Sequence, residues 1–234
     1  MGSIKQIAVV LVGSFILIAL IGVWIHKNNP SDNLLLTEVE ELEGPLSPKE
    51  LAISNPEVTN IMNRIAVMKT NKGDIEIELF EDVMPITTGN FIKLAEEKFY
   101  DGIKFHRVIP NFMVQAGDPN TKGDNTASYG TGGPGYTIQD EFIKNPLLTN
   151  VRGTIAMANT GQPNSGGSQF FINTVDNVTL DFGDDKAPQS NHPVFGRVIE
   201  GMDVVDAISW VETNASNLPE DPVIIESVTI ESRQ

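Results

Sequence analysis

The sequence predicts a mainly β domain in which short antiparallel strands form a closed or nearly closed barrel, accompanied by two helices. Three observations lead to this fold class. Many short runs are strand-like, only two segments are helix-like and they lie far apart, and glycine-rich segments connect the runs. The 234 residues suffice for one such domain together with an additional segment.

The predicted strands are short. Ile65–Thr70 and Asp74–Phe80 are strand-like, apolar and acidic residues alternate in the second of them, and Asn71-Lys72-Gly73 between them has the composition of a turn. Further strands are expected at Phe105–Val108, Phe112–Gln115, Thr154–Ala158, Gln169–Asn173, Val194–Val198 and Val223–Glu231.

Two segments favour helices. Pro85–Lys98 begins with a proline, which suits the first helical turn, and has Thr87 or Thr88 near its start. The second helix is expected over roughly Met202–Ser209.

The N-terminal segment has a different composition. Ile7–Ile25 is a run of 19 residues without a charge, close to the ~20 apolar residues that a transmembrane helix needs. It ends in bulky Val23-Trp24-Ile25 with no convincing cleavage site after it. An uncleaved single-pass anchor over residues 1–27 is therefore favoured over a cleaved signal peptide or a buried soluble helix. Because a long domain follows a short leader, the domain is expected outside the cytoplasm, on the periplasmic or cell-surface side.

Residues 28–62 contain seven acidic residues against Lys49 alone, and four prolines interrupt them. This composition is typical of an extended tether, with an acidic partner-binding tail as the alternative. The folded domain is then expected over residues 63–234. A net charge of −15 argues against nucleic acid and against binding to anionic lipid surfaces.

Several chemistries are disfavoured. The chain has no cysteine, and its three histidines, His26, His106 and His192, are scattered, so no metal site is expected. Gly130–Gly135 matches the spacing of a dinucleotide-binding loop, but Pro134 interrupts it and no helix start follows.

Three segments combine apolar side chains with a few polar groups: Phe105–Asp118, Gly153–Asn159 and Gly167–Asn173. In this order, and followed by His192–Val198, they closely resemble the cyclophilin family of peptidyl-prolyl cis–trans isomerases. The resemblance spans about Ile65 to the C-terminus. It implies an eight-stranded antiparallel barrel capped by two helices, a groove on its outer face, and binding of X-Pro-containing polypeptides with no cofactor. A monomer is expected.

The residue chemistry suits that activity. Rotation about an X-Pro bond crosses a barrier of about 18–20 kcal/mol because amide resonance must be lost, yet no covalent bond breaks. A catalyst needs an apolar socket for the proline ring and a donor aimed at the amide nitrogen, which gains a lone pair as the bond twists. A guanidinium is permanently charged and rich in donors.

By resemblance, Arg107 is the catalytic donor. Phe112, Met113 and Phe171 would form the proline socket, with Leu180 at its rim. The remaining substrate-binding positions implied are Gln115, Asn159, Thr160, Gln169 and His192.

Each polar position has an implied role. Gln115 and Asn159 would grip the substrate backbone, and Gln169 would support Arg107 or the substrate. Thr160 falls where the pocket for the residue before proline begins. His192 would stand at the pocket edge without acting as an acid or base, and His106 is interpreted as a structural hydrogen-bonding residue.

The chain departs from the family pattern beside the groove. Thr179 stands where the family often has a tryptophan that bonds cyclosporin, so weakened cyclosporin inhibition is predicted. Asp181–Asn191 is longer than the corresponding turn, and Gln162 is an apparent insertion. Both could change substrate preference.

Two functional hypotheses remain. The first is an isomerase that assists the folding of extracytoplasmic proteins, and the second is a membrane-tethered module that binds proline peptides with little turnover. Intact Arg107 favours the first. A ligand-carrying barrel would need an open interior, against which the many bulky strand residues argue.

Overall fold

The structure is a computed structural model that describes residues 63–183 and 191–232. The predicted anchor and tether lie outside these residues. Neither of the two α-helices that the structure does describe has the length and apolar character needed to cross a membrane.

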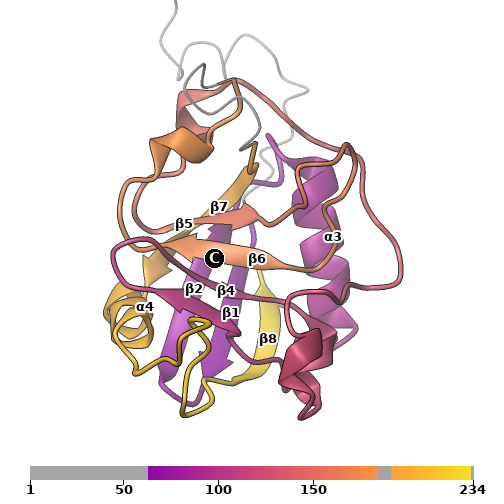
Figure 1. The fold of residues 1–234 in the computed structure, drawn as a ribbon. Coiled ribbons are helices and arrows are strands. Elements are labelled where there is room, and N and C mark those ends of the chain that lie inside the picture. Colours follow the sequence, from indigo (N-terminus) through magenta and orange to yellow (C-terminus); the bar gives the residue numbers. More distant parts are fainter. Residues whose placement is uncertain (1–62, 184–190, 233–234) are drawn as a thin grey trace, which may run out of the picture. The chain divides into compact units, whose positions relative to one another are not determined.

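Eight antiparallel strands form one sheet, as the resemblance implied (Figure 1). Its order is β3-β4-β6-β5-β7-β2-β1-β8, and every pair of neighbours is antiparallel. The strands are β1 (Ile65–Thr70), β2 (Gly73–Leu79), β3 (Arg107–Ile109), β4 (Met113–Ala116), β5 (Thr154–Met157), β6 (Phe170–Asn173), β7 (Val194–Glu200) and β8 (Ile225–Glu231).

The sheet curls into a half-barrel, which corrects the expectation of a closed one. Its end strands β3 and β8 do not pair with each other in the described residues. The seam is bridged instead by irregular backbone contacts, in which Phe105 N donates to Val223 O at 2.9 Å and Ile225 N to Ile103 O at 2.8 Å. Within the described residues the seam contains one isolated antiparallel bridge, between Lys104 and Ile224.

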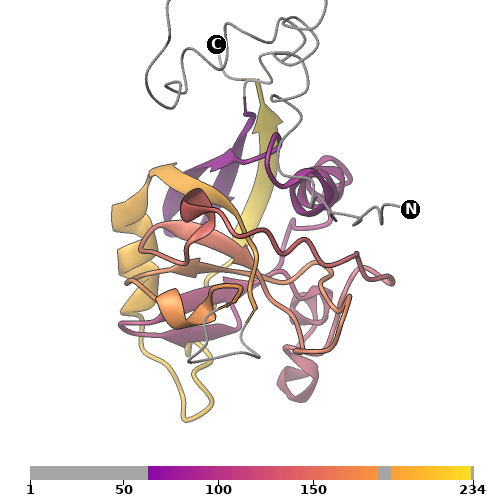
Figure 2. The ribbon, with the colours of Figure 1, turned by 90° about the horizontal axis from the view of Figure 1, so that it is seen from above.

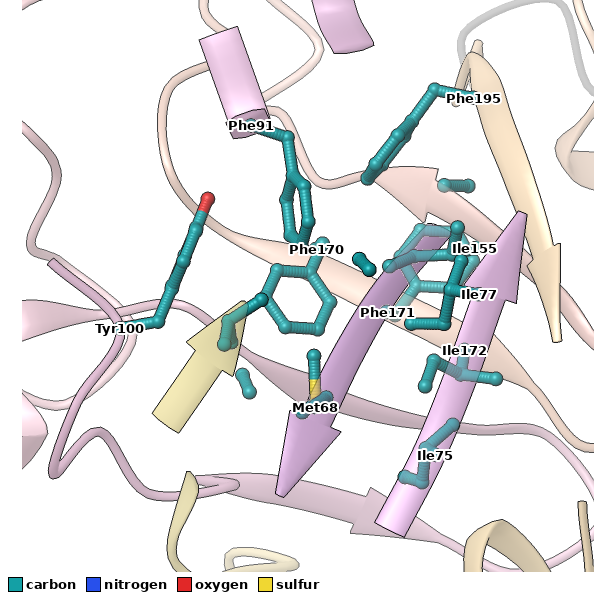
Figure 3. Close-up of a cluster of buried hydrophobic side chains, with 14 of the residues drawn as sticks. Met68, Ile75, Ile77, Phe91, Tyr100, Ile155, Phe170, Phe171, Ile172 and Phe195 are labelled. Carbon is teal, nitrogen blue, oxygen red and sulfur yellow. The ribbon is translucent and has the colours of Figure 1, made fainter. Parts of the chain in front are cut away.

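The interior of the curl is filled by side chains (Figure 3). Phe91 has its ring centroid 5.0 Å from that of Tyr100, 5.6 Å from that of Phe170 and 5.4 Å from that of Phe195. All four side chains are fully buried. Such packing contradicts the hypothesis of an open, ligand-carrying barrel.

Two helices flank the sheet on opposite sides, α3 (Pro85–Glu96) and α4 (Met202–Ser209) (Figures 1 and 2). The start of α3 has no side-chain cap from its own flanking residue Met84. The buried carboxylate of Glu141 serves instead, accepting from Ile86 N at 3.1 Å and from Thr87 N at 2.8 Å. A distant acidic residue therefore satisfies the orphan amides of this helix.

Candidate active site

Strand register brings the main functional residues onto one surface. Arg107 pairs with Gln115, which in turn pairs with Phe171, so these side chains share the outer face of β3, β4 and β6. The alternate residues on these strands are buried and face the core: Val108, Val114 and Ile172. The period-two pattern thus separates core from site.

An apolar socket lies beside Arg107. Met113 and Phe171 are 1% and 4% exposed, and half-buried Phe112 stands next to them. The guanidinium carbon of Arg107 lies 5.8 Å from the Phe112 ring centroid, and its Nη1 lies 3.8 Å from Met113 Sδ. His192 packs edge-on against Phe171 with 5.3 Å between centroids. An apolar surface and a cation are therefore in direct contact.

A chain of amides orients the guanidinium. Arg107 Nη1 donates to Gln115 Oε1 at 3.4 Å, and Gln115 Nε2 donates to Gln169 Oε1 at 3.0 Å. Gln169 Nε2 then donates to the carbonyl oxygens of Gly132 at 2.8 Å and Gly130 at 3.1 Å. No carboxylate of the described residues forms a salt bridge with Arg107. Its charge is held in place without being neutralised.

Substituting Gln169→Leu is expected to lower kcat/KM about tenfold, because the amide chain is broken while side-chain volume is kept. Isomerisation assays and thermal unfolding check this together. Gln139→Leu is the control, since it makes the same change at an exposed glutamine outside the pocket that Gln115 and Gln169 line. An unchanged rate in Gln169→Leu would show that Arg107 needs no such support.

Asp118 fixes the Gly130–Gly132 loop, whose carbonyl oxygens end the series of amide hydrogen bonds from Arg107. Its fully buried carboxylate accepts from Asn120 N at 2.8 Å and from Gly132 N at 3.2 Å. The sequence motif contained Asp118, but its role was not predicted. Its position at the end of a matched motif was the only available signal.

Asn159 and Thr160 line a second pocket beside the socket. The pocket has a volume of ≈ 540 Å³, and Gln115 and Gln169 form its wall toward Arg107. The Asn159 side chain holds its own loop, since Nδ2 donates to Asn191 O at 2.6 Å and Oδ1 accepts from Gly161 N at 3.0 Å. The Asn159 side chain is therefore occupied within its loop, and its backbone N–H and C=O are the groups left to contact a substrate.

Leu180 and His192 form the opposite edge. Leu180 ends the 3-10 turn η4 (Val178–Leu180), is half-buried and packs against the core. The His192 amide donates to Leu180 O at 3.0 Å, and Asn150 Nδ2 donates to His192 O at 3.1 Å.

Behind this edge lies an asparagine network that the sequence did not reveal. Asn173 Nδ2 donates to Asn150 Oδ1 at 3.1 Å, and Asn177 Nδ2 donates to Asn173 Oδ1 at 2.8 Å and to Phe112 O at 2.8 Å. Asn150 and Asn173 are fully buried. The network ties the socket to η4, and isolated asparagines outside any periodic pattern gave no signal for it.

Neither histidine near the groove is set up for proton transfer. Burial lowers the pKa of His192, as does the nearby charge of Arg107, although a hydrogen bond to Met157 O opposes both. Burial likewise lowers the pKa of His106. Hydrogen bonding to the Lys104 backbone and to the Gln169 side chain opposes this shift, and the structural role expected of His106 stays a prediction.

These shifts predict a flat pH profile. Both pKa values lie below the ordinary value of about 6.5, so both rings are neutral above it, and kcat/KM should change less than about twofold from pH 6.5 to 8.5. The stability that neutral burial contributes is present above pH ~6.5 and is lost as the pH falls through the lowered folded-state values. A bell-shaped profile of kcat/KM centred between pH 6.5 and 8.5 would contradict the predicted flat profile.

Comparisons with known proteins identify the family of the chain. Residues 65–230 match the model of the family described as cyclophilin type peptidyl-prolyl cis-trans isomerase/CLD. The chain belongs to this family, and its activity is peptidyl-prolyl cis–trans isomerisation.

Relatives support the assignment along the whole described domain. A peptidyl-prolyl cis-trans isomerase of Acinetobacter baylyi is 44% identical over 176 residues, covering 74% of this chain and 88% of the relative. Isomerase B of Escherichia coli is 43% identical over 170 residues, covering 69% and 96%. A crystal structure of a Cryptosporidium parvum cyclophilin type isomerase determined with the dipeptide Ala-Pro has a TM-score of 0.61 at 30% identity, covering 72% and 99%.

Proposed function

We propose that this chain accelerates X-Pro rotation in unfolded or extended polypeptides, with Arg107 as the catalytic residue and the Phe112, Met113 and Phe171 surface as the proline socket. The single observation that carries the proposal is the unneutralised guanidinium of Arg107, which the amide chain holds against the socket. Extended chains are the preferred substrates because the groove lies on an outer strand surface.

The proposed mechanism is differential binding of the twisted amide. The proline ring packs on Phe171 and Met113, which fixes one side of the rotating bond. As resonance is lost, the amide nitrogen becomes pyramidal, and an N–H of Arg107 donates to its new lone pair. Partial desolvation of the Arg107 guanidinium against the socket lowers its pKa, and an arginine nevertheless remains protonated at neutral pH. No nucleophile and no proton transfer are needed.

The test is relaxation of a cis-enriched X-Pro peptide in the presence of the purified full chain. Uncatalysed exchange takes tens to hundreds of seconds, so catalysis shortens it visibly at low enzyme concentration. Binding of the same peptide is measured in parallel. Binding without acceleration would identify a proline-peptide binding module instead.

We further propose that residues 1–27 anchor the chain in a membrane, that residues 28–62 act as a tether, and that the domain acts as a monomer outside the cytoplasm. The support is the uncharged run Ile7–Ile25 and the acidic, proline-containing segment after it. Protease treatment of intact cells, with lysed cells as control, should digest the domain. Protection in intact cells would contradict the proposed side.

Weak cyclosporin inhibition is expected from Thr179, an exposed residue of η4 next to Leu180. Substituting Thr179→Trp should strengthen inhibition at least about tenfold, since an indole adds apolar contact and one N–H donor. Inhibition constants of both forms on the same peptide check this. Equal constants would show that this position does not limit the inhibitor.

A further inference from the structure

An apolar pocket lies beyond the socket, on the far side of η4. Its volume is ≈ 460 Å³. We call it the η4 pocket, defined by its apolar lining residues Ile143, Pro146, Leu148, Val178 and Phe182. Ile143, Val178 and Phe182 are 41%, 48% and 42% exposed, and their gathering in one pocket is typical of a binding surface.

The pocket is built rather than incidental. Leu148 is 8% exposed and belongs to the core. The rings of Phe142 and Phe182 stack at 5.3 Å with an interplanar angle of 10°, which joins the two loops that form the walls. Asp181 accepts from Asn150 N at 2.7 Å, which fixes the chain just before Phe182. Both walls are therefore held in place.

The pocket lies at one end of the substrate groove. Gln169, which precedes β6, lines the second pocket together with Thr160, on the side expected to hold residues before the proline. Asn173 at the other end of β6 bonds Asn177, which leads into η4 (Figure 1, the orange turn at the upper left). Phe171 and the proline socket lie between these two ends. A chain leaving the socket away from Thr160 therefore passes over η4.

The separation suits a short stretch of substrate. Leu180, at the rim of the socket, and Val178, in the pocket, are the two ends of a single 3-10 turn. The two residue steps between them advance about 4 Å along the turn, and an extended chain advances about 3.3 Å per residue. The second or third residue after the proline can thus reach the pocket.

We propose that the η4 pocket is a specificity subsite that binds an aliphatic or aromatic side chain two or three residues after the substrate proline. This rests on the proposed function of the adjoining groove. The continuity of η4 between socket and pocket assigns the substrate chain, rather than another partner, as the occupant.

The test uses X-Pro peptides with glycine at all three positions after the proline, compared with peptides carrying one leucine at the second or third position. Exchange NMR gives turnover without a protease, and fluorescence anisotropy gives affinity. For the full-length wild-type chain, one leucine peptide should have a kcat/KM about tenfold above that of the glycine peptide.

Ile143→Ser and Val178→Ser should each reduce this leucine preference to about twofold or less. Leu147→Ser is the matched control, because Leu147 is 64% exposed on the neighbouring turn but does not line the pocket. It should keep the full preference. Two pocket variants are used in case one of them fails to fold, and thermal unfolding is measured for both.

No leucine preference in the wild-type chain, or a preference that survives both substitutions, would overturn the subsite. Dimerisation in sedimentation that Val178→Ser abolishes, with no peptide preference, would assign the pocket to a second copy and also overturn it. If no peptide is turned over at all, the proposed function fails, and the affinity ratio of leucine to glycine peptides still decides on the subsite.

Discussion

Substituting Arg107→Ala is expected to lower kcat/KM about 100- to 1,000-fold, the loss that follows removal of one donor aimed at charge developing in a transition state. The effect should be this large because, within the described residues, no second cationic side chain contacts Phe112 and Met113. A protease-coupled assay on one X-Pro peptide measures it. The fold should be retained, since Arg107 is exposed and forms no ion pair in the described part of the chain.

The matched control is Arg152→Ala, which also removes an exposed arginine. Arg152 pairs with Asp206 at 2.7 Å and is absent from both groove pockets. Its loss should leave the isomerisation rate within about twofold and reduce stability by about 1 kcal/mol or less. If Arg107→Ala retained the wild-type rate, a guanidinium donor would not be part of the mechanism.

Substituting Gly117→Ala is expected to destabilise the domain by more than about 4 kcal/mol. Gly117 has a φ of +94°, and an added Cβ would lie 2.2 Å from Ser168 O and 2.8 Å from Gln169 Cα. Both are backbone atoms of the segment that enters β6, so no side-chain rotation relieves the clash. The segment would have to move away from β4, which carries Gln115.

Chemical denaturation of the two forms measures this loss. Gly102→Ala is the control, because Gly102 has a similar φ of +80° with nothing within 4 Å of an added Cβ. It should lose only about 1–2 kcal/mol, the strain of the left-handed conformation. Equal losses at the two positions would mean that backbone strain, and not the clash with Ser168, limits position 117.

Much of the fold was predictable because its local signals agree with its packing. β1 and α4 have the predicted bounds, since the strand-like run Ile65–Thr70 ends at a turn and the apolar spacing of Met202–Ser209 buries Val205 and Ile208. The seam was mispredicted. Whether two end strands pair depends on the path of residues 217–225, which periodicity does not encode.

The candidate site likewise contains residues that the sequence predicted and contacts that it did not. Arg107, Gln115 and Phe171 were predicted from contiguous motifs, and strand register places them side by side. The Glu141 cap and the Asn150–Asn173 pair were missed. Each joins residues far apart in the sequence through one or two hydrogen bonds, and such contacts exist only once the chain has folded.

The central claim is that Arg107 stabilises the twisted amide and not the planar one. The most direct measurement is exchange NMR on a bound X-Pro peptide, which separates its dissociation constant from the rate of cis–trans interconversion on the protein. For Arg107→Ala we predict a dissociation constant within about fivefold of wild type and a bound-state rate at least about 100-fold lower. A weakened dissociation constant with an unchanged bound-state rate would show that Arg107 only binds substrate, and would contradict the mechanism.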